Sequence, residues 1–322
     1  METKKVIIAG GGVLGSQISL MCAFIGHDTT ILIRPEDDLK QTQAKLSRYS
    51  GMMMEDLESC KEYIGKPAAE AKYPHGLIRK WEGITFEKID ELKLQVENGV
   101  RNNIRITSCK DGIFDDAYIV IEAVSENPDV KTDFYLSVRD LLPADTLIVT
   151  NSSTLIPSRF AEATGRPEKY CALHFANTIW RCNTAEIMRH EGTDPDVFDK
   201  VVEFAEGINM IPLKVMKEQP GYILNSMLVP WLAASEALWV NGIADPETID
   251  LTWKVGFGSP VGPFEHIDVI GLDTVYNINL MKPDVNVEGS VINRLSKMLK
   301  EKIDRGETGV NAGVGFYDYR NR

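Results

Sequence analysis

His174 is the residue of this sequence best placed to exchange a proton near neutral pH. It follows the apolar segment 170–173, which has the composition of a buried strand, and Phe175, Ala176 and Asn177 come next. Glu186 lies in a second apolar segment, 184–188, which would run beside the first. A carboxylate hydrogen-bonded to an imidazole fixes its tautomer and favours the imidazolium, so the pair predicts a general base. Taken alone, a histidine at a strand end is more often a structural hydrogen-bonding residue than a base. The nearby Glu186 and the glycine-rich segment described next favour the catalytic interpretation.

That glycine-rich segment has the G-x-G-x-x-G spacing of a dinucleotide site. It follows a strand-like segment, 6–9, and precedes a helical pattern over 16–24. The first glycine permits a tight turn, the second lets backbone N–H groups approach a pyrophosphate, and the third lets helix and strand pack closely. An ordinary glycine-rich turn is the alternative. We therefore predict a nicotinamide cofactor, which would accept the hydride while His174 takes the proton, bound at Gly10, Gly12, Val13, Leu14 and Gly15.

The end of the next strand-like segment, 29–33, bears on which nicotinamide cofactor is bound. NAD-specific domains usually carry an acid here for the ribose hydroxyls, whereas this chain has Ile33 followed by Arg34. A guanidinium pairs with a 2′-phosphate, so the sequence predicts NAD or NADP with NADP slightly favoured. In the alternative, Arg34 is a solvated charge and one of the nearby acids binds the ribose, namely Glu36, Asp37 or Asp38.

Polar residues follow three further strand-like segments, 118–124, 147–150 and 170–173, where a parallel sheet would form its ligand crevice. Segments 104–107 and 209–213 also read as strands, and a mostly helical insert covers 37–103. After Pro220 the pattern becomes helical, over 222–241, 246–255, 269–278 and 291–302. The predicted fold is therefore α/β: a Rossmann-type, mostly parallel sheet domain over 1–217, followed by an all-α substrate and dimerisation domain over 218–322.

The bulk properties of the 322 residues narrow the partners and the compartment. The net charge of −12 argues against nucleic acid, and no apolar run is long enough to predict a membrane span. The five cysteines and five histidines show no metal-ligand spacing, so we expect no metal. An odd number of cysteines and an N-terminus without signal-peptide character predict a cytoplasmic protein.

Motifs along nearly the whole chain resemble the L-3-hydroxyacyl-CoA dehydrogenases, the family of 3-hydroxybutyryl-CoA dehydrogenase. The glycine motif, the Asn151-Ser152-Ser153 segment and the His174-Phe175-x-Asn177 motif are similar to successive signatures of that family. Further matches are 122–127, 220–225, 258–265, 271–273 and 313–317.

The resemblance implies roles for individual residues. His174 would be the catalytic base and Glu186 its partner, while Ser153 would hydrogen-bond the reacting oxygen and Asn225 would reach the substrate carbonyl. The residues implied to contact the cofactor are Glu126, Lys131, Asn151, Ser153 and Asn177. The expected function is hydride transfer between a nicotinamide cofactor and the 3-hydroxy or 3-keto group of an acyl-CoA in fatty acid metabolism. The expected assembly is a homodimer formed through the C-terminal domain.

Departures from the family pattern keep two other functions open. Ile33 stands where the family has its ribose-binding acid, Thr178 follows Asn177 where a proline is common, and Ser226 replaces a common arginine. The CoA-contacting residues of the family could not be matched in the helical insert. A free 3-hydroxy acid, gulonate- or carnitine-like, is one alternative, with a cation such as Arg181 for its carboxylate. A non-catalytic, crystallin-like dinucleotide-binding protein is the other.

Overall fold

The computed structural model describes residues 2–320, which form two compact units divided between Ile223 and Leu224. The first contains a sheet whose eight strands, counted within the described residues, run in the order β3-β2-β1-β4-β5-β6-β7-β8. Neighbouring strands are parallel except for the antiparallel pair β6 and β7. The strands are β1 Lys5–Ala9, β2 Asp28–Leu32, β3 Ile104–Thr107, β4 Ile119–Glu122, β5 Leu147–Thr150, β6 Tyr170–Phe175, β7 Thr184–Met188 and β8 Ile211–Val215.

Both faces of this sheet are buried, as the near-continuous apolar strands require. Val6 and Ile8 of β1 belong to the larger core, and Ile7 between them belongs to a second core on the opposite face. The larger core is packed by α1 (Val13–Ile25), α2 (Leu39–Ser59), α3 (Phe86–Asn98) and α5 (Pro195–Gly207). The second is packed by α4 (Pro128–Val138) and the short helices of segment 157–164.

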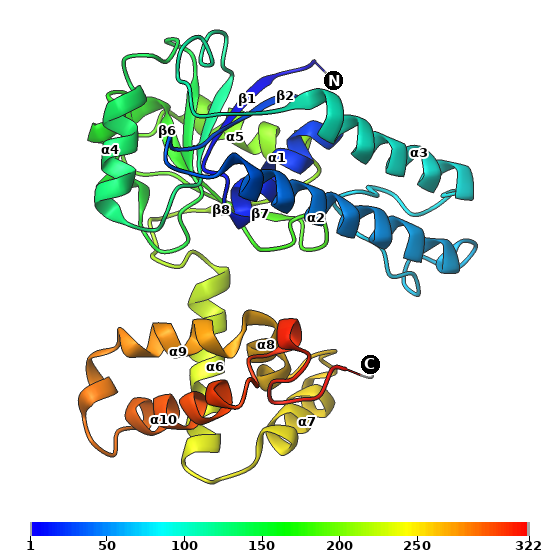
Figure 1. Cartoon of the computed structure of the whole chain (residues 1–322), viewed down its shortest axis with the longest axis vertical. Helices are drawn as coiled ribbons and strands as arrows, with labels where there is room; N and C mark the ends of the chain where they lie inside the picture. The colour runs from blue at the N-terminus through cyan, green and yellow to red at the C-terminus, as the bar shows by residue number, and fades with distance from the viewer. Residues whose placement is uncertain (1, 321–322) are drawn as a thin grey trace. The chain divides into compact units, whose positions relative to one another are not determined.

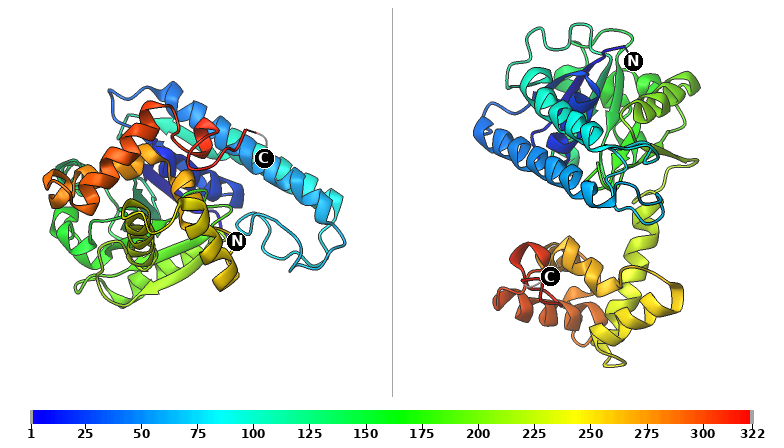
Figure 2. Two further views of the ribbon diagram at one scale, coloured as in Figure 1. Left: turned by 90° about the horizontal axis from the view of Figure 1, so that it is seen from below. Right: turned by 90° about the vertical axis from the view of Figure 1, so that its right-hand side faces the viewer.

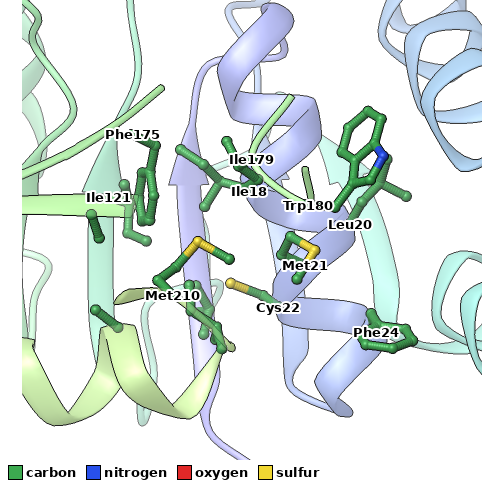
Figure 3. Packing of buried hydrophobic residues seen from close by; sticks show 14 of the residues in the cluster. Ile18, Leu20, Met21, Cys22, Phe24, Ile121, Phe175, Ile179, Trp180 and Met210 are labelled. Carbon is green, nitrogen blue, oxygen red and sulfur yellow. The ribbon is translucent and has the colours of Figure 1, made fainter. Parts of the chain in front are cut away.

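Helix α1 shows how this packing fixes the glycine turn. Its buried Ile18, Met21 and Cys22 face Ile121 of β4 and Phe175 of β6 in the larger core (Figure 3). This face anchors the helix directly behind the turn that joins it to β1. The long helices α2 and α3 supply the helical insert and lie side by side beyond α1 (Figures 1 and 2).

The second unit, as described over 224–320, is helical apart from isolated bridges near its end. Its core gathers residues from each of its long helices, including Leu232, Phe264, Leu272 and Leu299. The helices are α6 Leu224–Val240, α7 Pro246–Phe257, α8 Pro263–Ile270, α9 Leu272–Leu280 and α10 Val291–Asp304.

The predicted fold class is confirmed, with differences at element ends. The helix expected over 269–278 is instead the end of α8 and the start of α9, because Gly271 adopts a left-handed φ of 93° between them. His174, expected at the end of a strand, lies one residue before the end of β6, Tyr170–Phe175. The predicted domain boundary after residue 217 falls in the connection between β8 and α6, shortly before the division observed after Ile223.

Candidate active site

The turn after β1 has the shape that a dinucleotide requires. A Cβ at Gly10 would meet the backbone of Ala123, and one at Gly15 would meet the carbonyl oxygen of Gly10, so both positions need glycine for packing. A Cβ at Gly12 would meet nothing in the protein, which leaves that side of the turn open to a ligand. Gly12 is also the N-cap of α1 and provides no side-chain cap, so the positive end of the helix is available to a phosphate. Val13 and Leu14 form the first turn of α1.

A cavity of about 1050 Å³ opens from this turn toward the end of β2. Its lining includes the backbone of Gly10–Gly12, the segment Ala123–Ser125 and three basic residues, Arg34, Lys45 and Lys110. The cavity lies at the point where the strand order reverses, between β1 and β4, which is where open α/β sheets bind ligands.

The two aspartates nearest to Arg34 in this cavity are already engaged. Asp37 accepts hydrogen bonds from the Arg34 guanidinium, with Nη2 to Oδ1 at 2.7 Å, and this contact lowers the pKa of Asp37. Asp38 caps α2 by accepting a hydrogen bond from the Lys40 amide at 2.8 Å. Both carboxylates therefore already accept hydrogen bonds from within the protein.

His174 and Glu186 are direct cross-strand partners in the antiparallel pair β6–β7. The distance from His174 Nδ1 to Glu186 Oε2 is 3.1 Å, and the side chains are 5% and 3% exposed. At this depth the low local dielectric strengthens the attraction between a carboxylate and an imidazolium. Donation from Nδ1 to Glu186 leaves the Nε2 lone pair to receive a proton.

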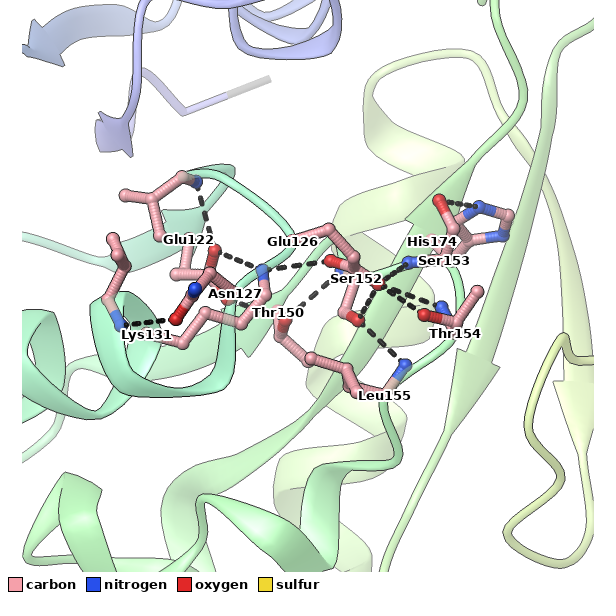
Figure 4. Close-up of polar contacts among 12 residues, drawn as sticks. Glu122, Glu126, Asn127, Lys131, Thr150, Ser152, Ser153, Thr154, Leu155 and His174 are labelled. Carbon is pink, nitrogen blue, oxygen red and sulfur yellow. Dashed lines mark hydrogen bonds and ion pairs between the residues drawn. The ribbon is translucent and has the colours of Figure 1, made fainter. Parts of the chain in front are cut away.

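Ser153 lies on the other side of the imidazole, with Oγ 3.2 Å from Nε2 (Figure 4). Its loop is held by Glu126, whose Oε1 accepts from Ser152 Oγ at 2.6 Å, from the Ser153 amide at 3.1 Å and from the Thr154 amide at 2.9 Å. Burial acts to raise the pKa of Glu126, but these hydrogen bonds and the charge of Lys131 outweigh it and lower that pKa. Glu126 is therefore an ionised anchor for the serine loop.

Lys131 holds Glu126 from inside the protein. Its ammonium lies 3.3 Å from Glu126 and 2.7 Å from Glu122, and its side chain is 1% exposed. Glu122, fully buried at the end of β4, also accepts hydrogen bonds from Tyr135 and Thr150. The sequence placed Glu122 in the family-like segment 122–127 but assigned it no role, although a glutamate that ends an otherwise apolar strand was a usable signal.

The remaining predicted residues occupy separate places. Asn151 directly follows β5, and its Oδ1 accepts a hydrogen bond from the Phe175 amide at 3.0 Å, which braces β6 beside His174. Asn177 is exposed in the loop after β6. Asn225 lies in the first turn of α6, in the second unit. Direct contacts of Asn151, Asn177 and Lys131 with the cofactor, and of Asn225 with substrate, stay predictions.

Two contacts to the histidine–glutamate pair come from residues to which the sequence assigned no role. The Tyr222 ring is stacked on the His174 imidazole, with centroids 4.7 Å apart and planes 18° from parallel. The amide of Ile223 donates to Glu186 Oε1 at 2.8 Å. Both follow the Pro220-Gly221 dipeptide, so an aromatic residue directly after this turn was the available signal.

Within residues 2–320 no group of His, Cys, Asp or Glu side chains is arranged to hold a metal ion. No helix in the described part of the chain combines the length and apolar character needed to cross a membrane.

Comparison with known proteins identifies the family. Residues 80–219 match the model for the NAD-binding domain of 3-hydroxyacyl-CoA dehydrogenase, and residues 221–319 match that for its C-terminal domain. The chain is 27% identical to the human mitochondrial hydroxyacyl-coenzyme A dehydrogenase over 98% of its own length and 91% of the relative. It is also 27% identical to 3-hydroxybutyryl-CoA dehydrogenase of Clostridioides difficile, over 98% of this chain and 99% of that protein.

A solved structure of a diketoreductase is 39% identical to this chain, with a TM-score of 0.78 over 99% of this chain and all of that one. The (S)-3-hydroxybutyryl-CoA dehydrogenase PaaH1 of Ralstonia eutropha, at 23% identity and a TM-score of 0.70, shares the fold. The glycine turn, the cavity at the strand switch and these matches together make the chain an oxidoreductase with a nicotinamide-cofactor domain that belongs to the 3-hydroxyacyl-CoA dehydrogenase family.

Proposed function

We propose that this protein interconverts the 3-hydroxy and 3-keto groups of an acyl-CoA, with His174 as general base in the oxidative direction. The observation that carries the proposal is the line of contacts from Ser153 through His174 to Glu186. It supplies a base, the carboxylate that stabilises its protonated form, and a hydroxyl beside the atom that takes the proton.

The chemistry follows from these contacts. When the substrate alcohol is oxidised, its hydroxyl proton passes to His174 Nε2, its C–H hydride leaves, and the carbonyl double bond forms. A nicotinamide cofactor held at the turn of Gly10, Gly12 and Gly15 would supply the acceptor for that hydride. Ser153 donates a hydrogen bond to the reacting oxygen, while Glu186 stabilises the positive charge that develops on the imidazole. Reduction of the ketone runs the same steps in reverse, with the imidazolium as the acid.

The cofactor we infer is NADP. Arg34 lines the cavity at the end of β2, its side chain is 62% exposed, and Ile33 takes the place of an acid. Lys45 adds a second cation on the same side of the cavity, since its Nζ lies 3.4 Å from the carbonyl oxygen of Gly11. The commitment of Asp37 and Asp38 to other groups supports a phosphate site here rather than a ribose-binding acid.

A dicarbonyl compound without CoA is the second candidate substrate. The diketoreductase is described as catalysing reactions of dicarbonyl compounds. Its sequence is 39% identical to this chain, and this similarity favours the second candidate. A free 3-hydroxy acid bound by Arg181 receives less support. The Arg181 guanidinium is paired with Asp56, with Nε to Oδ2 at 2.6 Å and Nη2 to Oδ1 at 2.8 Å.

Initial rates separate these possibilities. The purified protein would be supplied with acetoacetyl-CoA, acetoacetate or a simple diketone, and oxidation of NADPH and NADH would be followed in parallel. We expect the fastest turnover with acetoacetyl-CoA and NADPH. Turnover confined to the diketone would transfer the assignment to the second candidate. Tight cofactor binding without turnover of any substrate would support the non-catalytic alternative.

The assembly we propose is a homodimer formed through the second unit. This unit exposes large apolar side chains, and Val255, Phe257 and Met281 are at least 75% exposed in the single chain. Extensive apolar exposure is typical of a surface covered by a partner. The molar mass measured by light scattering should be twice that of the 36.0 kDa chain.

A further inference from the structure

Tyr222 lies in the left-handed region of backbone conformation, with φ of 54°, and its side chain is 1% exposed. Pro220 and Gly221 create this geometry. They occupy the centre of a turn in which the Tyr222 amide donates to the carbonyl of Gln219 at 2.9 Å, and Gly221 has φ of 79°. Left-handed φ values are uncommon for aromatic residues and concentrate at functional sites, where the surroundings enforce them.

The Tyr222 side chain packs on the face of the sheet that carries the histidine–glutamate pair. Its apolar neighbours include Ala172 of β6 and Met188 of β7. Residues two apart in a strand point to the same face, so Ala172 accompanies His174 and Met188 accompanies Glu186. The tyrosine therefore covers both members of the pair from one side.

We propose that Tyr222 is a positioning residue for the general base. Its ring lies flat on the imidazole at 4.7 Å and prevents rotation of that plane, so that Nδ1 stays directed at Glu186 and Nε2 at Ser153. The π face of a tyrosine also attracts a cation, so the ring favours the imidazolium over the neutral imidazole as the proton arrives.

The neighbouring contact acts in the same direction. The Ile223 amide donates to Glu186 Oε1, while Oε2 of the same carboxylate faces His174. Two consecutive residues of one turn thus fix both partners, the histidine by a ring and the glutamate by a backbone hydrogen bond. This inference rests on the proposed function, because it assigns Tyr222 a part in that reaction.

Two substitutions separate the ring from its hydroxyl. Tyr222→Leu should lower kcat about tenfold, equivalent to ~1.4 kcal/mol, and leave cofactor KM within about twofold of wild type. Tyr222→Phe keeps the ring and should retain kcat within about twofold. Tyr118→Leu is the matched control, because Tyr118 directly precedes the amino-terminal end of β4, whereas the site lies at the carboxyl ends of the strands. The Tyr118→Leu variant should have the kcat of wild type. If the leucine variant fails to fold, Tyr222→Met replaces it.

Two kinetic results would overturn the proposal: wild-type kcat in a folded leucine variant, or an equal loss in the phenylalanine variant. A measurement without turnover isolates the stacking itself. The NMR signal of the His174 Cε1 proton, assigned by its loss in His174→Gln, should show an upfield ring-current shift in wild type and Tyr222→Phe but not in Tyr222→Leu. An unshifted wild-type signal contradicts the stacking. A shifted signal in a protein without turnover contradicts only the proposed function.

Discussion

At the scale of single residues, we expect the preference between NADP and NAD to depend on the side chain that follows Ile33. Arg34 should donate charge-assisted hydrogen bonds to a 2′-phosphate, at the cost of part of its present pairing with Asp37. A 2′-hydroxyl carries no charge to form such an ion pair. We expect Arg34→Ala to weaken NADPH binding about 10- to 100-fold and NADH binding less than about twofold.

Calorimetric titration of both cofactors checks this preference. Arg48→Ala is the control, because Arg48 is an exposed arginine on α2 outside the described cavity lining, and it should change neither affinity. If Arg34→Ala lowers the affinities for NADPH and NADH equally, Arg34 does not bind the 2′-phosphate.

Residue-scale prediction succeeded where the chemistry is local in sequence. The requirement for glycine at position 15 follows from one strand–turn–helix unit, since a Cβ there would meet the carbonyl oxygen of Gly10. The close approach of Gly10 to the backbone of Ala123 is a tertiary contact that the unit alone does not predict. The stacking of Tyr222 on His174 could not be predicted in the same way. It depends on a turn that docks against strands far away in the sequence, and no periodicity reports such a contact.

At the scale of elements, a buried ion pair supports the serine loop. It joins Glu122, at the carboxyl end of β4, to Lys131, near the start of α4. Lys131 neutralises Glu122, which is fully buried, and it also pairs with Glu126. Removing one partner of a buried pair leaves an uncompensated charge. Lys131→Met should therefore lower the free energy of unfolding by ~3 kcal/mol in urea denaturation.

The control for this change is Lys88→Met. Lys88 forms an exposed pair with Glu91 on α3, which should be worth less than ~1 kcal/mol. The double variant Lys131→Met with Glu122→Gln should recover part of the lost stability, since the stranded carboxylate is gone. If Lys131→Met alone lowers the free energy of unfolding by less than ~1 kcal/mol, Lys131 does not stabilise the charges of Glu122 and Glu126.

At the scale of the whole molecule, stability should depend on one buried acid in the second unit. Burial raises the pKa of Glu236 from 4.5 to about 7, so the folded state keeps this proton after the unfolded chain has lost it. The contribution of Glu236 to the free energy of unfolding therefore falls as pH rises from about 4.5 to about 7, and it stays low above that range.

Glu236→Gln removes this dependence. We expect the variant to be more stable than wild type at pH 8, by ~2–3 kcal/mol, and to match it below pH 4.5. Glu301→Gln, an exposed change on α10, is the control and should be neutral at both pH values. Melting temperatures of both proteins would be measured from pH 4 to pH 8. If the wild-type and Glu236→Gln values change with pH in the same way, Glu236 is charged in the folded protein and the prediction is wrong.

The order of the two domains was predictable because the hydrophobic pattern changes along the chain, from strand–helix alternation to long helical periodicity. Boundaries were less predictable. The single helix expected over 269–278 is two helices, since the positive φ of Gly271 interrupts the helical backbone there. The position of an N-terminal motif, a strand or a domain follows from local patterns, whereas the partners of buried charges such as Glu122 follow from tertiary packing.

The central claim is that His174 is the base, and His174→Gln tests it most directly. With acetoacetyl-CoA and NADPH, the account predicts that kcat falls at least about 100-fold while NADPH binding, measured separately, is unchanged. His190→Gln is the matched control, since His190 is as buried but bonds to the backbone at Pro167 and Gly192, and it should retain turnover if folded. A His174→Gln protein that keeps most of its turnover would contradict the assignment of the base.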